Sequence, residues 1–308
     1  MFTETFVAAL LLGAVTAGIP LLLAGLGEQI SEKAGVLNIG LEGMMLAGAY
    51  AGFAVAYHAD SFALGFLAGG AAGLAAAMLM VLCCVIGGMN QIVVGIAITL
   101  GAEGLTALEH HFAFSRSYPR LPKAETLPVP GLSELPVVGR AFFDHPPLVY
   151  LAVLLTFVMV WIYRRTHIGL NLQAAGDRPA ALDAAGVGVR TTRALAVLST
   201  GFLAGVGGAY LSAVGGGLFL PFMTGGDGFI AIVLAMLARG RPTWVLLGAF
   251  LFGISLSLTT ALQVAGVNVP TDVIQMLPFA MVIVVLVLFG RNSRLPPALG
   301  LPYRRGVR

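Results

Sequence analysis

The chain has few charged residues and few cysteines. Asp, Glu, Lys and Arg make up 10% of its 308 residues, and 58% are hydrophobic, whereas about 25% of an average soluble chain is charged. This shortage of charge excludes an ordinary soluble domain and predicts a membrane protein. The two cysteines, Cys83 and Cys84, are adjacent in an apolar run. That spacing excludes ordinary disulfide geometry and leaves a zinc site without its other ligands, so we interpret them as packing residues.

Motifs of nucleotide, hydrolytic and metal chemistry are also missing. Lys33 and Lys123 are the only lysines, and neither follows a G-x-x-x-x-G-K-[ST] loop for nucleotide phosphates. G-x-S-x-G and H-E-x-x-H do not occur, so an intramembrane hydrolase lacks its nucleophile or metal motif. The formal charge of +3 comes from dispersed positive residues, which gives nucleic-acid binding no support. The sequence therefore predicts a protein that is not an enzyme and has no cofactor or metal.

Long apolar runs predict an all-α polytopic membrane protein, because a spanning helix needs about 20 predominantly apolar residues. Seven segments are clear candidates: Val7 to Gly27, Phe62 to Gly88, Ile92 to Leu108, Leu148 to Tyr163, Ala194 to Val214, Trp244 to Val264 and Val273 to Phe289. Met44 to Tyr57 and Phe229 to Ala238 are shorter and follow stretches rich in Gly and polar residues. We predict seven to nine spans in a single domain (residues 1–308), with two interrupted helices and a weak two-half symmetry. Glycine, at 41 residues, predicts helices that pack backbone to backbone.

The distribution of arginine predicts the orientation of the chain. Arginines gather in residues 164–193, in residues 291–308 and at Arg239 and Arg241, which predicts that these three regions are cytoplasmic. Alternation of the spans then places the N-terminus and residues 109–147 outside. This external loop contains seven prolines, so we expect an irregular, stiff segment with little helix. It either covers the mouth of a pathway or is a plain solvated connector.

Polar residues at membrane depth are the candidates for a transport pathway, because charge there is costly and usually faces a bundle interior or an aqueous cavity. The candidates are Asn38, Glu42, Asn90, Gln91, Thr99 and Asp227. Asn38 and Glu42 are four residues apart and are expected to share one helix face, which favours a pathway role over a solvated turn. Asn90, Gln91 and Thr99 either line the pathway or cap and cross-link helices. Asp227 precedes a short helix, where capping is the default interpretation and pathway lining the alternative.

A cytoplasmic stretch predicts a short docking helix from Arg178 to Ala185. Asp177 suits an N-cap, Pro179 suits the first turn, and the glycine at 186 suits a C-terminal stop. The surface is mostly alanine, which favours insertion into a groove on another protein over burial in lipid. Ala181 is expected to point into that groove, and the glycine at 176 to let the backbone turn close to the partner. The predicted contact residues are Gly169, Gly176, Asp177, Arg178, Pro179, Ala181, Ala184 and Gly186.

Three segments carry a resemblance to a known family. They are GEQISEKAGVLNIGLEG at residues 27–43, GLNLQAAGDRPAA at 169–181 continuing through AAGV at 184–187, and GDGFIAI at 226–232 with RGRP at 239–242. With these segments the chain resembles the permease subunits of bacterial ABC importers of the branched-chain amino acid, ribose and nucleoside type. It is most similar to the nucleoside and simple-sugar branch. The resemblance covers nearly the whole chain, although LAMLA at residues 234–238 departs somewhat from the family's usual sequence.

The resemblance implies a permease subunit of an ATP-driven importer in the bacterial cytoplasmic (inner) membrane. It implies that residues 169–187 are similar to the coupling helix that touches the ATPase. The implied partners are an ABC ATPase subunit, a second and different permease subunit, a soluble or lipid-anchored binding protein, and membrane lipid. The implied substrate is a small molecule, a nucleoside (a purine nucleoside is our choice) or a simple sugar. The alternative is an ion-coupled secondary transporter of a small polar solute, with Glu42 and Asp227 as coupling acids.

Overall fold

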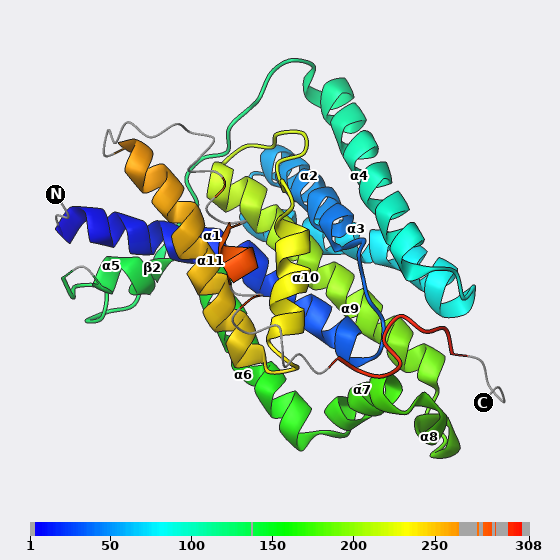
Figure 1. Cartoon of the computed structure of the whole chain (residues 1–308). Coiled ribbons are helices and arrows are strands. Elements are labelled where there is room, and N and C mark those ends of the chain that lie inside the picture. Colours follow the sequence, from blue (N-terminus) through cyan, green and yellow to red (C-terminus); the bar gives the residue numbers. More distant parts are fainter. Residues whose placement is uncertain are drawn as a thin grey trace.

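The computed structural model describes residues 4–136, 138–264, 276, 280–284, 287 and 295–303. These residues form an almost entirely helical bundle (Figure 1), which confirms the predicted all-α class. The helices are α1 (Glu4–Lys33), α2 (Leu41–Ala59), α3 (Phe62–Met80), α4 (Gln91–Phe114), α5 (Val138–Phe143), α6 (Pro147–Arg165), α7 (His167–Asp177), α8 (Pro179–Ala184), α9 (Val189–Tyr210), α10 (Asp227–Leu237) and α11 (Pro242–Val264). Two π-helical turns, η1 (Val81–Ile86) and η2 (Leu211–Gly216), extend α3 and α9.

Five helices in the described part of the chain are long and apolar enough to cross a membrane. They are Phe6–Lys33, Phe62–Ile86, Gln91–Phe114, Pro147–Arg165 and Val189–Gly216. Four of them contain a predicted span, α11 contains a fifth, and Phe62–Ile86 ends two residues before the predicted end at Gly88. The chain is therefore a multi-pass membrane protein. The seventh predicted span, Val273 to Phe289, lies mostly outside the described residues.

The two segments predicted to be short differ in length. Helix α2 has 19 residues and is about 28 Å long at 1.5 Å per residue, close to the roughly 30 Å of a bilayer core. Its predicted start at Met44 was too late because Glu42, an acidic residue, already lies in its first turn, where the helix dipole favours negative charge. Helix α10 has 11 residues, about 16 Å, and is too short to span.

The first helix extends beyond its predicted end at Gly27 as far as Lys33. The extra turns are polar, but the structure gives their side chains internal partners. Ser31 Oγ hydrogen-bonds Thr200 Oγ1 of α9 (2.8 Å), and Glu28 accepts a backbone N–H from the following turn. Buried polar groups that are hydrogen-bonded in this way are tolerated in a bundle interior. The stretch is therefore a buried helix end rather than a solvated cytoplasmic turn.

Glycines bring α2, α3 and α9 into backbone contact. A Cβ on Gly205 of α9 would collide with the backbone of Gly69 of α3, and a Cβ on Gly48 of α2 would collide with the backbone of Gly205. Gly201 of α9 meets Gly73 of α3 in the same way. Small residues allow this close approach in membranes, where lipid removes the hydrophobic drive for helices to associate. The predicted use of glycine is confirmed at this three-helix seam.

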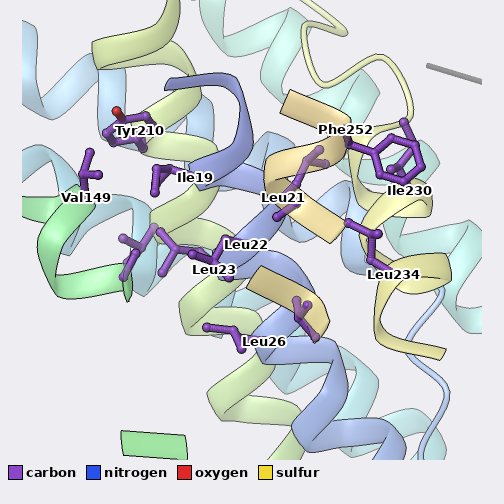
Figure 2. Packing of buried hydrophobic residues seen from close by; sticks show 14 of the residues in the cluster. Ile19, Leu21, Leu22, Leu23, Leu26, Val149, Tyr210, Ile230, Leu234 and Phe252 are labelled. Atoms are coloured by element: carbon purple, nitrogen blue, oxygen red, sulfur yellow. The ribbon is translucent and has the colours of Figure 1, made fainter. Parts of the chain in front are cut away.

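A hydrophobic core surrounds α1. Its buried leucines face α6, α9, α10 and α11, so that α1 is the central helix of this side of the bundle. Figure 2 shows the labelled members of this core: Ile19, Leu21, Leu22, Leu23, Leu26, Val149, Tyr210, Ile230, Leu234 and Phe252. Helix α10 is too short to span the membrane, and its packing onto α1 and α11 holds it in the bundle.

The helix formed by α9 and η2 defines the two ends of the bundle. It has 28 residues, about 42 Å at 1.5 Å per residue. At its start, Arg193 donates to Ala175 of α7 and to Leu301 of the C-terminal segment (residues 295–303). Beyond its end, Gly217 O accepts the N–H of Leu121, in the loop after α4 (2.7 Å). The segments predicted to be cytoplasmic and the loop predicted to be external therefore lie at opposite ends.

The predicted external loop contains little regular structure, as expected from its prolines. Its described residues include α5 and two short strands, β1 (Leu127–Pro128) and β2 (Asp144–His145). These strands pair antiparallel, with Leu127 opposite His145 and Pro128 opposite Asp144. Figure 1 shows α5 and β2 near the N-terminal half of α1, away from α7 and α8. The start of α1 and this loop thus share one end of the bundle.

Candidate functional site

Glu42 connects the start of α2 to the start of α10, the two helices that follow stretches rich in Gly and polar residues. It lies buried in the first turn of α2, and its carboxylate accepts the N–H of Gly226 (2.9 Å) and of Gly228 (2.6 Å) at the start of α10. The first N–H groups of a helix have no partner within the helix, and the helix dipole makes them a favourable site for negative charge. A Cβ on Gly228 would lie 2.5 Å from Glu42 Cα, so glycine permits this approach. We call Glu42, residues 226–228 and residues 34–40 the polar junction.

Asp227 does not cap α10, contrary to the default interpretation of the sequence. It is the first residue of the helix, the N-cap position belongs to Gly226 with φ of 99°, and no N-cap side-chain hydrogen bond forms there. Glu42 supplies the cap from another helix instead. Glu42 accepts N–H groups from the residues on both sides of Asp227, so the junction combines a helix start with two acids.

Asn38 lies in the turn between α1 and α2 and not on the helix with Glu42, so the expectation of a shared helix face is wrong. The turn is fixed by side chains from two helices. Asn38 N–H donates to Glu28 Oε1 of α1 (3.0 Å), and Leu37 N–H donates to Gln91 Oε1 of α4 (2.8 Å). These bonds replace helical ones, because the backbone groups freed by an interrupted helix must find partners inside the protein.

The polar junction contains buried oxygen atoms that no described residue satisfies. Asn38 donates through Nδ2 to Met44 Sδ (3.3 Å), but its Oδ1 atom has no partner in the described part of the chain. Oε2 of Glu28, which borders the junction through Asn38, has no partner there either. Unpaired buried polar atoms cost free energy unless water or a ligand reaches them. Their concentration beside broken helices is typical of a polar pathway through a bundle.

The three candidates on α4 separate into different roles. Gln91 is buried and belongs to the junction through Leu37. Thr99 is buried where α4 crosses α2, since a Cβ on Gly43 would lie 2.7 Å from Thr99 Cα. Asn90 is exposed, and its side chain caps α4 by accepting the N–H groups of residues 92 and 93. The structure therefore brings Gln91 close to the junction, places Thr99 at a helix crossing and leaves Asn90 outside.

The predicted docking helix is α8, and its boundaries differ slightly from the expected ones. It covers Pro179–Ala184, with Arg178 at the N-cap and without a side-chain capping bond. Asp177, the predicted N-cap, ends α7 instead and accepts a hydrogen bond from Gln173 Nε2 (3.2 Å). Gly186 follows with φ of +83°, the left-handed conformation that glycine adopts at helix ends. The predicted stop is confirmed.

The small surface of α8 faces outward. Ala181 and Ala184 are exposed, while Leu182 is 4% exposed and packs into a cluster with α7 and α9. Gly169 and Gly176, by contrast, face the chain itself: a Cβ on Gly169 would lie 2.6 Å from Tyr163 Cα of α6, and one on Gly176 would collide with Lys33 O of α1. The expectation that Gly176 turns the backbone towards a partner is therefore wrong. It allows α7 to pack against α1.

Two residues of these sites were not identified from the sequence. Glu28 holds the turn at Asn38, and Arg193 joins α7 to the end of α1. In the sequence, Arg193 served only to predict the topology. Its position directly before a predicted span was a further signal, because an arginine there must be paired or solvated. Their partners lie 10 and 159 residues away along the chain, and only the folded structure brings them together.

Comparisons with known proteins agree with this architecture. Residues 10–286 match the family model of the branched-chain amino acid transport system permease component. The chain is 42% identical to the putative glucose ABC transporter permease protein TsgC13 of Haloferax volcanii over 252 residues, which cover 81% of this chain and 76% of that protein. It is 31% identical to the guanosine ABC transporter permease protein NupQ of Bacillus subtilis, with 94% of each chain covered.

A third relative extends the same pattern. The chain is 30% identical to the nucleoside ABC transporter permease protein NupC of Lactococcus lactis, with 92% of this chain and 93% of that protein covered. The matches to all three relatives include most of the chain, and the family match contains both Glu42 and α8. The resemblance seen in the sequence segments is thereby confirmed. The chain belongs to the permease family of branched-chain amino acid transport systems.

Proposed function

We propose that this chain is the permease subunit of an ATP-driven ABC importer for nucleosides or simple sugars, with purine nucleosides as the preferred substrate. The observation that carries the proposal is the polar junction, in which Glu42 joins α2 to the start of the short helix α10. Interrupted helices whose ends meet within the bundle are the usual setting of a substrate pathway. Asn38, Gln91 and Asp227 border that pathway, and Thr99 supports the wall formed by α2 and α4.

The substrate class is supported by the names of three relatives, which are a putative glucose, a guanosine and a nucleoside ABC transporter permease. Nucleosides and sugars share several hydroxyl groups, which buried carboxylate and amide groups recognise by hydrogen bonds. Selectivity among them is assigned to a separate binding protein that delivers the substrate. The chain then supplies half of the pathway and pairs with a second, different permease subunit in the bacterial cytoplasmic membrane.

Energy is supplied by an ABC ATPase subunit that contacts α8. The exposed Ala181 and Ala184 give this helix a small, smooth outer surface, which suits insertion into a groove on a partner. Leu182 anchors the helix to α7 and α9 on the opposite face, so a force on α8 acts on the bundle. Hydrolysis itself takes place in the partner, and this chain transmits its motion.

Transport in proteoliposomes tests the proposal against ion coupling. The chain is reconstituted with its candidate permease partner, ATPase and binding protein, and uptake of labelled guanosine and glucose is measured. We expect uptake that requires internal ATP and continues after ionophores collapse proton and sodium gradients. Uptake driven by an ion gradient without ATP would contradict the proposal and favour a secondary transporter. Glucose uptake without guanosine uptake would retain the importer and replace the preferred substrate.

A further inference from the structure

Arg193 joins three segments that are far apart in the sequence. Its side chain is 3% exposed and donates four hydrogen bonds, each to a backbone carbonyl oxygen. The acceptors are Ala34 O after the end of α1 (3.1 Å), Ala175 O in the last turn of α7 (3.1 Å), and Leu301 O (2.7 Å) and Ala298 O (3.5 Å) of the C-terminal segment. One guanidinium group therefore contacts α1, α7 and the C-terminal segment together.

The carbonyl groups at the two helix ends need an outside donor. In a continuing helix, Ala175 O would accept the N–H of residue 179, but residue 179 is proline and has none. Ala34 O would similarly accept the N–H of Asn38, which donates to Glu28 instead. The C-terminal ends of helices carry partial negative charge. Arg193 thus satisfies both carbonyls and places its own charge where it is favourable.

Two glycines allow the backbones to meet around the guanidinium group. Gly35 has φ of +85°, and a Cβ there would lie 2.9 Å from an Arg193 nitrogen and 3.2 Å from Ala298 O. Gly176 lies against Lys33 O, and its own carbonyl accepts the N–H of Ala298 (2.9 Å). Gly35 O accepts the N–H of residue 300 (3.1 Å). The three segments are therefore tied by backbone hydrogen bonds as well as by Arg193. We call this arrangement the clasp.

We propose that Arg193 is a positioning residue for transport, and that the clasp makes the end of α1 move together with α7. The inference rests on the proposed function, in which the ATPase moves α8 and, through it, α7. Ala34 is four residues before Asn38, so motion of the clasp reaches the turn at Glu28 and Asn38 and then the start of α2. Arg193 touches no substrate. Its role is to connect the motor contact to the polar junction.

The test compares Arg193→Met and Arg193→Lys with Arg190→Met, a control at an exposed arginine one turn earlier in α9. Two quantities are measured on the full transporter complex in proteoliposomes: substrate taken up per ATP hydrolysed, and the rate of maleimide labelling at Ala298→Cys. The labelling background has Cys83 and Cys84 replaced by alanine. Co-purification of the ATPase reports assembly.

Arg193→Met is expected to accelerate labelling at position 298 and to lower uptake per ATP about tenfold, as loss of charge-assisted hydrogen bonds predicts. The ATPase still co-purifies. Arg193→Lys keeps the charge but cannot reach three segments with one compact ammonium group, so both quantities change in the same direction by less. The Arg190→Met control matches the parent. If Arg193→Met does not reach the membrane, Arg193→Lys carries the test.

Three results would overturn the inference: unchanged labelling, unchanged uptake per ATP, or loss of the ATPase from the complex, which would make Arg193 an assembly residue. Failure of the proposed function is recognised separately. If bulky substitutions on α8 leave coupling intact, the motor contact lies elsewhere, yet labelling at position 298 still reports whether Arg193 holds the C-terminal segment.

Discussion

At the scale of single residues, Glu42 has the clearest structural role. Its carboxylate caps a helix whose N-cap, Gly226, lies 184 residues later in the chain, and it accepts both N–H groups at 2.9 Å or less. A side chain that only lined a pathway would not need two backbone donors. Glu42 therefore positions α10 and at the same time places negative charge at the polar junction, and these two effects can be separated by substitution.

Glu42→Gln is predicted to reduce uptake by about tenfold or more at normal membrane levels. The amide keeps one oxygen acceptor, but its NH2 group meets the second backbone N–H, and a lost hydrogen bond to a charged group costs about 1.5–3 kcal/mol. Initial uptake rates measure transport, and quantitative blotting of membranes measures the amount of protein there. The control is Glu109→Gln, which neutralises an exposed carboxylate at the end of α4. Parental uptake by Glu42→Gln, with poor folding of Glu42→Leu, would make the residue purely structural.

At the scale of elements, glycines decide which helices can touch. Gly205→Val is predicted to destabilise the protein by about 3 kcal/mol, because its Cβ would collide with the backbone of α3 at Gly69 and Gly73. Gly101→Val on α4 is the matched control, since a Cβ there meets nothing within 4 Å. Thermal unfolding of the purified proteins in detergent measures both. Equal melting temperatures for the two variants would show that the seam of α2, α3 and α9 tolerates separation.

Helix α8 is the second element with a testable surface. Ala181→Trp or Ala184→Trp is predicted to overfill the partner's groove, so that ATP hydrolysis stimulated by the binding protein and uptake fall together. Both alanines are exposed, so the variants are expected to fold and reach the membrane. Ala113→Trp, at an exposed position at the other end of the bundle, is the control. Normal coupling in both α8 variants would make α8 a surface connector.

At the scale of the whole molecule, the proposed function assigns different roles to the two ends of the bundle. The clasp and α8 lie at one end and the proline-rich loop at the other, and the continuous helix of α9 and η2 between them is about 42 Å long. In the proposed function, a binding protein that delivers substrate and an ATPase that supplies energy approach from opposite sides of the membrane. The arrangement therefore requires that α8 be cytoplasmic and the loop external.

Single-cysteine labelling of intact cells tests this orientation. In a background without Cys83 and Cys84, Arg120→Cys in the loop is predicted to react with a membrane-impermeant maleimide. Arg178→Cys is predicted to react only after the cells are permeabilised, because the positive-inside distribution places it in the cytoplasm. Both positions are exposed, so access to the reagent differs only by the side of the membrane. Reaction of Arg178→Cys in intact cells would contradict both the predicted topology and the proposed ATPase contact of α8.

The sequence by itself determined the features that depend on local physics. Scarce charge and long apolar runs predicted the helical membrane class, and Pro179 and Gly186 marked a short helix to within one residue at each end. The exposed alanine surface of α8 also followed from its composition. These predictions succeed because hydropathy, proline geometry and glycine conformation act within a few residues.

Only the tertiary structure decided which residues meet. Asn38 was expected on a helix with Glu42 and lies in a turn, because Glu28 and Gln91 hold that turn open from other helices. Gly176 was expected to face a partner and instead faces α1. The same holds for Arg193, whose acceptors span residues 34 to 301. Contacts of this range depend on how helices pack, and packing is a property of the whole bundle rather than of any local pattern.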